Sequence, residues 1–139
     1  MKTNPQTKLT AVTKNDALFL YDLLKEREST VNISHKKMPT YAQHIKFIES
    51  KPYSKWYIIK FGNKKIGSVY LSKQNEIGIF IIKDMHSKKL GTSILKALIE
   101  KNHRKRYLAN INPKNKKSIG FFKKNGFKLL QYTFELKQV

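Results

Sequence analysis

One stretch of the chain constrains its fold more than any other: an apolar strand runs through a basic turn into a helix. In "EIGIFII" (76–82), the side chains on both faces of the strand are apolar except for that of Glu76. This pattern is typical of a central strand that is buried on both faces. After the turn, apolar residues recur at helical spacing from Ile94 to Ile99. The sequence therefore predicts a strand, a tight turn and a helix in immediate succession.

The turn itself is suited to an anion. The first N–H groups of a helix have no partner within the helix, and the helix dipole makes that end positive. Gly91 has no Cβ to keep a ligand from the backbone, while Lys88 and Lys89 add charge and Ser87 and Thr92 add hydroxyl donors. We expect an anion site here, with an ordinary unliganded turn as the alternative.

The other segments alternate between the helical and the strand period. Thr13 is expected as an N-cap, "GNK" (62–64) as a hairpin turn, and Gly126 as the end of a short helix. By range, we expect strands at 6–12, 54–61, 65–72 and 106–111, helices at 13–28, 40–51 and within 112–127, and a last strand or hairpin at 127–136. This order predicts an α/β (α+β) fold in one domain, residues 1–139, with a mixed, mostly antiparallel sheet flanked by about four helices.

Charge and composition limit the partners. Lys and Arg number 29 against 9 Asp and Glu, a net charge of +20 that attracts nucleic acid, phosphorylated cofactors, acidic substrates or an anionic surface. A Lys-rich solvated surface is the alternative reading, and it also covers "RKRY" (104–107). Cys is absent, which excludes disulfides, thiolate zinc sites and a cysteine nucleophile and favours the cytoplasm. No apolar run approaches the roughly 20 residues that a membrane span needs. The four His are scattered, so no metal site is expected. The G-x-S-x-G motif of serine hydrolases is absent from the sequence.

Two motifs connect the chain with a family. "HSKKLG" (86–91) follows the apolar strand, and "NKKSIGFFKKNGF" (115–127) lies farther along. Together they resemble the two signatures of the Gcn5-related N-acetyltransferase (GNAT) superfamily, Arg/Gln-x-x-Gly-x-Gly/Ala and Asn-x-x-Ser/Ala followed by aromatic residues and Gly-Phe. His86 stands at the Arg/Gln position, Lys89 at the first Gly and Gly91 at the second, and the resemblance covers residues 75–128.

The resemblance implies acetyl-CoA as cofactor. The turn amides from Ser87 to Thr92 would hold the pyrophosphate, the backbone around Ile81 would pair with the pantetheine arm, and Lys116 and Lys117 would join the basic turn around the 3′-phosphate. The cofactor-binding candidates are Ile81, His86, Ser87, Lys88, Lys89, Leu90, Gly91, Thr92, Asn115, Ser118 and Phe122.

The resemblance also implies roles in catalysis. Glu76 resembles the carboxylate with which relatives remove the acceptor proton; an ordinary strand-end Glu is the alternative. The N–H near Ile81 would polarise the carbonyl. Phe122 stands where many relatives carry a Tyr that protonates the leaving thiolate, so Tyr132, Tyr107 or solvent would take that role.

The acceptor is expected against residues 32–47, which form the acceptor wall in the superfamily. His35, Tyr41 and His44 are the substrate-binding candidates, and either His could serve as base; surface or packing roles are the alternative. Trp56 and Tyr57 are interpreted as core residues.

We therefore expect an acetyl-CoA-dependent N-acetyltransferase. Its acceptor would be a small-molecule or nucleotide-sugar-linked primary amine, because a +20 protein repels polyamines and attracts anions. Nucleic acid is the less favoured partner, no membrane is expected, and a homodimer is left open. The alternative function is a non-catalytic basic module of the same fold that binds nucleic acid or another anionic partner.

Overall fold

Alternating apolar residues build one antiparallel sheet. The computed structural model describes residues 6–28 and 38–138, and its sheet has the order β1 (Thr7–Ala11), β2 (Lys55–Phe61), β3 (Lys64–Leu71) and β4 (Ile77–Ile81). Gly62 adopts φ 63° in the turn between β2 and β3, a conformation that suits glycine, and so the predicted hairpin is confirmed.

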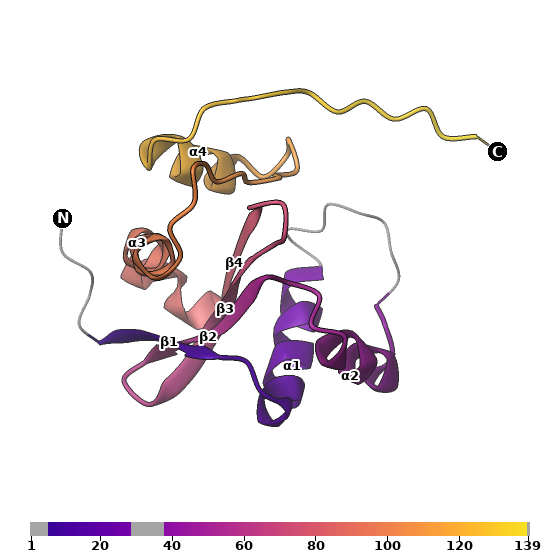
Figure 1. Cartoon of the computed structure of the whole chain (residues 1–139), viewed down its shortest axis with the longest axis vertical. Coiled ribbons are helices and arrows are strands. Elements are labelled where there is room, and N and C mark those ends of the chain that lie inside the picture. The colour runs from indigo at the N-terminus through magenta and orange to yellow at the C-terminus, as the bar shows by residue number, and fades with distance from the viewer. Residues whose placement is uncertain (1–5, 29–37, 139) are drawn as a thin grey trace.

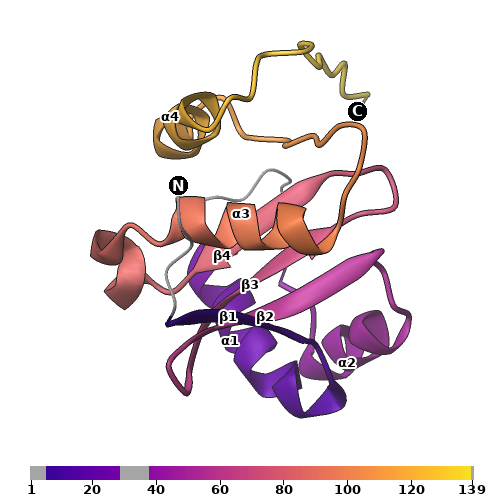
Figure 2. The same cartoon turned by 60° about the vertical axis from the view of Figure 1, so that its left-hand side comes forward.

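The helices cover both faces of the sheet. A 3₁₀ turn (Lys14–Asp16) leads into α1 (Ala17–Glu28), and α2 (Tyr41–Glu49) lies beside α1 on one face. A second 3₁₀ turn, η2 (Lys83–Lys88), precedes α3 (Gly91–Lys101) on the opposite face, and α4 (Lys116–Lys124) follows (Figures 1 and 2). The expected α+β fold, with a mostly antiparallel sheet and about four helices, is confirmed: the described residues form four α-helices and four strands that all pair antiparallel.

The predicted cap at Thr13 is confirmed, and it is tied to the sheet. The Thr13 N–H donates to Asp16 Oδ2 at 2.9 Å, and Lys65 Nζ lies 2.7 Å from Asp16 Oδ1. Burial by itself raises the pKa of Asp16, but the Lys65 ammonium and the hydrogen bonds from Thr13 outweigh it and hold the pKa below its ordinary value. The carboxylate is therefore charged at neutral pH and joins β3 to the start of α1.

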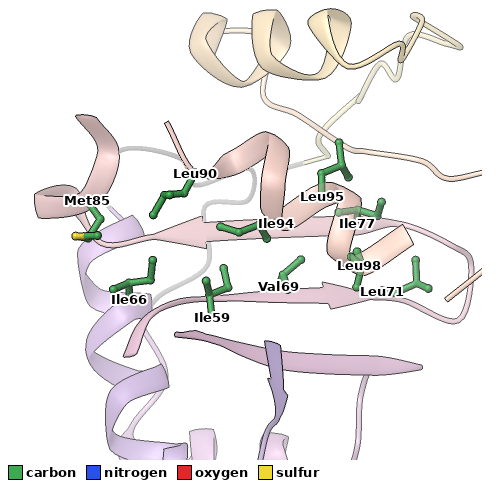
Figure 3. Close-up of a cluster of buried hydrophobic side chains, with 10 residues drawn as sticks. All are labelled: Ile59, Ile66, Val69, Leu71, Ile77, Met85, Leu90, Ile94, Leu95 and Leu98. Atoms are coloured by element: carbon green, nitrogen blue, oxygen red, sulfur yellow. The ribbon is translucent and has the colours of Figure 1, made fainter. Parts of the chain in front are cut away.

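The main core lies between the sheet and α3 (Figure 3). Ile94, Leu95 and Leu98 of α3 pack onto the strands, which confirms the predicted apolar stripe except for Ile99, which is half-buried. The sheet and the turn supply the other buried side chains of the cluster: Ile59, Ile66, Val69, Leu71, Ile77, Met85 and Leu90.

Three expectations about strands are wrong. β4 is the last strand of the sheet and not a central one, because residues 106–111 contribute only one parallel bridge, between Leu108 and Glu76. Residues 127–136 form no strand or hairpin although their side chains alternate, because no described segment lies beside them as a partner. This segment runs away from the sheet beyond α4, in yellow in Figure 1.

Candidate active site

The free edge of β4 is the backbone of the site. The backbone N–H of Ser72 donates to Glu76 O, and the backbone N–H of Ile82 donates to Ile66 O. The even-numbered residues from 76 to 82 therefore form their backbone hydrogen bonds with β3 and its extension. The odd-numbered residues Ile79 and Ile81 therefore direct their N–H and C=O groups away from β3. Ile77, the first of them, already donates outward to Leu108 O at 2.8 Å.

A cavity of about 310 Å³, here called the cofactor cavity, lies along this edge. Its walls come from α1, β4, the turn before α3, and α4. The sequence-predicted residues that line it are Ile81, His86, Lys89, Leu90, Gly91, Asn115, Ser118 and Phe122. The two motifs, 24 residues apart between Gly91 and Asn115, thus face one another across a single cavity.

His86 and Lys89, which differ from the residues of the motif that the sequence resembles, have distinct places in the turn. Lys89 adopts φ 54° and ψ 45°, the left-handed conformation that glycine adopts without cost and that is less favourable for other residues. The His86 ring contacts Ile81 O at 2.6 Å through Nε2, so in the Nε2–H tautomer it donates to the strand edge. The His86 side chain therefore braces the turn against β4, and the Lys89 backbone provides its left-handed bend; the sequence predicted neither role.

Gly91 is needed for packing. A Cβ at this position would lie 2.7 Å from Cε1 of Phe121, so the absence of a side chain lets α4 approach the start of α3. Among the side chains that the structure describes, none caps α3, so the amides of Gly91 and Thr92 in its first turn have no capping acceptor there. The electropositive helix start that the sequence predicts is therefore present at the cavity wall.

The second motif is built as a helix cap. Asn115 is the N-cap of α4, and its Oδ1 accepts from the Ser118 N–H at 3.1 Å. Thr92 does not line the cavity; its hydroxyl lies 3.3 Å from Asn125 Nδ2 and joins α3 to α4. Lys88 also lies outside the lining, and the side chain of Ser87 is not among those that the structure describes.

The two predicted catalytic side chains lie apart from this cavity. Glu76 accepts from Ser72 Oγ at 3.1 Å and from Asn110 Nδ2, and it lines neither of the two cavities described here. Tyr132 is 75% exposed on the segment after α4. Phe122 lines the cofactor cavity, with its ring against those of Phe121 and Phe127.

A second cavity of about 630 Å³, here called the aromatic cavity, lies on the face of the sheet covered by α1 and α2. His44, predicted to contact the acceptor, lines it, whereas Tyr41 does not, and His35 lies outside the described residues. Burial lowers the pKa of His44, which is therefore neutral at neutral pH. Trp56, interpreted from the sequence as a core residue, also lines this cavity, while Tyr57 packs against the core as expected.

Several lining residues were missed by the sequence analysis. Glu26 of α1 lines the cofactor cavity and its Oε1 accepts from the Lys83 N–H at 2.5 Å, which ties α1 to the turn after β4. These residues are 57 positions apart, so no local spacing could indicate their contact. Leu23 and Phe80 line both cavities, which therefore meet at these two side chains.

Among the described residues, no three His, Asp or Glu side chains gather closely enough to hold a metal ion. No helix in the same part of the chain is long and apolar enough to cross a bilayer.

Comparisons with known proteins agree with this geometry. The model of the Acetyltransferase (GNAT) family matches residues 18–127, and no curated protein sequence matches the chain significantly. A domain from Methanocaldococcus jannaschii DSM 2661 is 24% identical, with a TM-score of 0.78 and coverage of 93% of this chain and 92% of that one.

Two similar structures have stated activities. The microcin C7 self immunity acetyltransferase MccE, in complex with acetyl-CoA and AMP, is 19% identical (TM-score 0.68; 89% and 79% covered). The dodecameric spermidine N-acetyltransferase from Vibrio cholerae is 16% identical (TM-score 0.71; 90% and 81% covered). These likenesses extend over most of each chain and support the shared fold.

Proposed function

Because the chain belongs to the Acetyltransferase (GNAT) family, we propose that it transfers an acetyl group from acetyl-CoA directly to a primary amine. The acceptor would be a small or nucleotide-sugar-linked amine. The observation that carries this proposal is the cofactor cavity, where the free edge of β4, the uncapped start of α3 and the Asn115 cap of α4 meet. The AMP bound to MccE is consistent with a nucleotide-linked acceptor.

The residues of the cofactor cavity fit a phosphorylated pantetheine thioester. Lys83, Lys89 and Lys117 bring positive charge to one cavity, and the amides of the first turn of α3 suit a diphosphate. The outward N–H and C=O groups of Ile79 and the outward N–H of Ile81 suit the amides of an extended arm, as in strand addition at a sheet edge. Leu23, Met85, Leu90, Phe121 and Phe122 add apolar surface.

The cofactor supplies the acetyl group as a thioester when it is bound. The neutral acceptor nitrogen would bond to the acetyl carbon as the carbon–sulfur bond breaks, so a base must take the amine proton and the leaving thiolate must receive one. Glu76 is our candidate for the base, acting through water, with His44 as the alternative. The Ile81 N–H is the candidate donor to the carbonyl oxygen. With Phe122 unable to give a proton, Tyr132 or solvent would protonate the thiolate.

Calorimetric titration with acetyl-CoA, CoA and dephospho-CoA tests the cofactor. We expect acetyl-CoA to bind and, at about 100 times its Kd, to stabilise the fold by about 2.7 kcal/mol. Loss of the 3′-phosphate should weaken binding about tenfold, and Lys89→Ala should weaken it by about 3- to 10-fold, since one charged contact contributes on the order of 1 kcal/mol.

Lys105→Ala is the matched control for this titration, because Lys105 is exposed and lies outside the cavity. Absence of acetyl-CoA binding at low salt, together with salt-dependent binding of DNA or RNA, would reject the enzyme in favour of the basic binding module.

We also propose a homodimer, formed through the segment after α4. Leu130, Tyr132, Phe134 and Leu136 share one face of this extended segment and are exposed by 65%, 75%, 90% and 85%. In a symmetric pair of segments the four aromatic rings would bring about 600–1,000 Å² to the contact, and the leucines would add to it, which approaches the area of a stable interface. The dodecameric relative is an example of assembly in this fold.

Light scattering after size-exclusion chromatography tests the dimer. The wild type should have twice the 16.3 kDa mass of the chain, and Leu130→Lys with Phe134→Lys should be monomeric. Gln131→Lys with Thr133→Lys adds the same charge to the other face of the segment and should leave a dimer. A monomeric wild type at concentrations of about 100 μM would reject the proposal.

A further inference from the structure

The aromatic cavity is built by cross-strand rows of the sheet. The register places Trp56 of β2 beside Tyr70 of β3 and Gly78 of β4, and Ile58 beside Ser68 and Phe80. These two rows point to the same face, the one that α1 and α2 cover, because residues two apart on a strand share a face. Trp56, Tyr70, Ser68 and Phe80 thereby form the floor of the aromatic cavity.

Aromatic rings continue from this floor up one wall. The rings of Tyr53 and Tyr70 are stacked, with centroids 3.9 Å apart and an angle of 7° between their planes. Tyr53 lies edge-on to Trp56 at 4.9 Å, and Phe47 of α2 lies edge-on to both at about 6 Å. A Cβ at Gly78 would lie 2.2 Å from the Tyr70 ring, so this glycine makes room for the stacked pair.

The polar groups of the cavity are few and uncharged. Its lining contains no Asp, Glu, Lys or Arg in the part of the chain that the structure describes. His44 is 5% exposed, and its Nε2 and the Nε1 of Trp56 are buried without a hydrogen-bond partner among the described residues. A buried polar atom without a partner is unfavourable, so both nitrogens favour a ligand that offers a hydrogen bond.

From these observations we infer that the acceptor carries a flat, uncharged conjugated ring, which binds in the aromatic cavity while the amine reaches the cofactor cavity past Leu23 and Phe80. The inference rests on the proposed function and adds the class of substrate. The aromatic faces stack on such a ring, and Trp56 Nε1 and His44 Nε2 bond its polar edge. A polyamine is a poor fit, because the described lining offers no carboxylate to a cation.

Two sources could supply such a ring, and matched amines distinguish them. Phenethylamine is compared with hexylamine, and a UDP-linked amino sugar is compared with the same amino sugar 1-phosphate; spermidine represents the polyamines. Released CoA is measured with a thiol reagent, to which the cysteine-free chain adds no background. We expect kcat/KM to be at least about tenfold higher for the ring-bearing member of one pair, and that pair identifies the source.

Variants of one strand link this preference to the cavity. Trp56→Leu should remove most of the preference for the ring, mainly through KM, whereas Phe61→Leu, on the same strand but packed against the core on the α3 side, should retain it. Trp56 is the single tryptophan of the chain, so saturable quenching of its fluorescence by phenethylamine or UMP reports binding without turnover.

The outcomes separate the two proposals. Failure to bind acetyl-CoA rejects the proposed function. If acetyl-CoA binds but amines without a ring react as well as their ring-bearing partners, or if neither ring-bearing ligand quenches Trp56 fluorescence, the proposed function stands and the inference about the acceptor is overturned. The inference about the acceptor is supported if a ring-bearing ligand quenches Trp56 fluorescence saturably, if the same ligand does not quench free tryptophan in this way, and if ring-bearing amines are the better substrates.

Discussion

Gly67→Ala is expected to destabilise the protein by at least about 3 kcal/mol, because a side chain at this position collides with the backbone of the next strand. Gly67 is buried in β3 opposite Ile81, and a Cβ there would lie 2.1 Å from Phe80 O and 3.0 Å from Ile81 Cα. No rotamer change can relieve a contact with backbone atoms, so β3 and β4 would have to separate at the edge of the cofactor cavity.

Urea unfolding followed by Trp56 fluorescence measures this loss. Gly120→Ala is the matched control: Gly120 lies in α4 with no atom within 4 Å of its would-be Cβ, and the change should stabilise the protein by about 0.5–1 kcal/mol. A Gly67→Ala variant as stable as the wild type would contradict the close approach of β3 and β4.

Patterns of residues close together in the sequence made much of the cofactor cavity predictable. An apolar run followed by Gly91 and a helical stripe specifies a strand, a turn and a helix, and the Asn115 cap follows from the preference of Asn for helix starts. The sequence also placed an electropositive helix start at Gly91, although it attributed the glycine to ligand approach. The contact with Phe121, 30 positions away, explains the glycine and depends on tertiary packing.

The features that the sequence did not predict correctly depend on contacts between residues that are distant in sequence. Residues 106–111 have strand-forming side chains, yet only Leu108 meets β4, and alternation in 127–136 cannot supply a neighbouring strand. The aromatic cavity was missed for a similar reason: Trp56, Tyr70 and Gly78 are separated in the sequence and become neighbours only through the register of three strands. Without the register, the sequence offered no reason to interpret Trp56 as anything other than a core residue.

Glu76→Gln should lower turnover by roughly 10²-fold or more and leave acetyl-CoA binding unchanged if Glu76 is the base. The substitution keeps the shape of the side chain, and the amide oxygen can still accept from Ser72 Oγ or Asn110 Nδ2. Turnover at saturating substrates and the calorimetric Kd are measured together. Glu100→Gln, on an exposed position of α3, makes the same change in net charge and should behave as the wild type.

The contacts of Glu76 also suit a structural role, in which its carboxylate joins the start of β4 to residues 108–110. In that case Glu76→Gln would lower the melting temperature and leave turnover unchanged, and His44→Gln would lower turnover instead. Burial holds the pKa of His44 below its usual value, so a reaction that uses the neutral His44 ring loses rate only as the pH falls through that lowered pKa. If His44→Gln keeps the wild-type rate and Glu76→Gln loses it, Glu76 is the base. The reverse result assigns the proton transfer to His44 in the aromatic cavity.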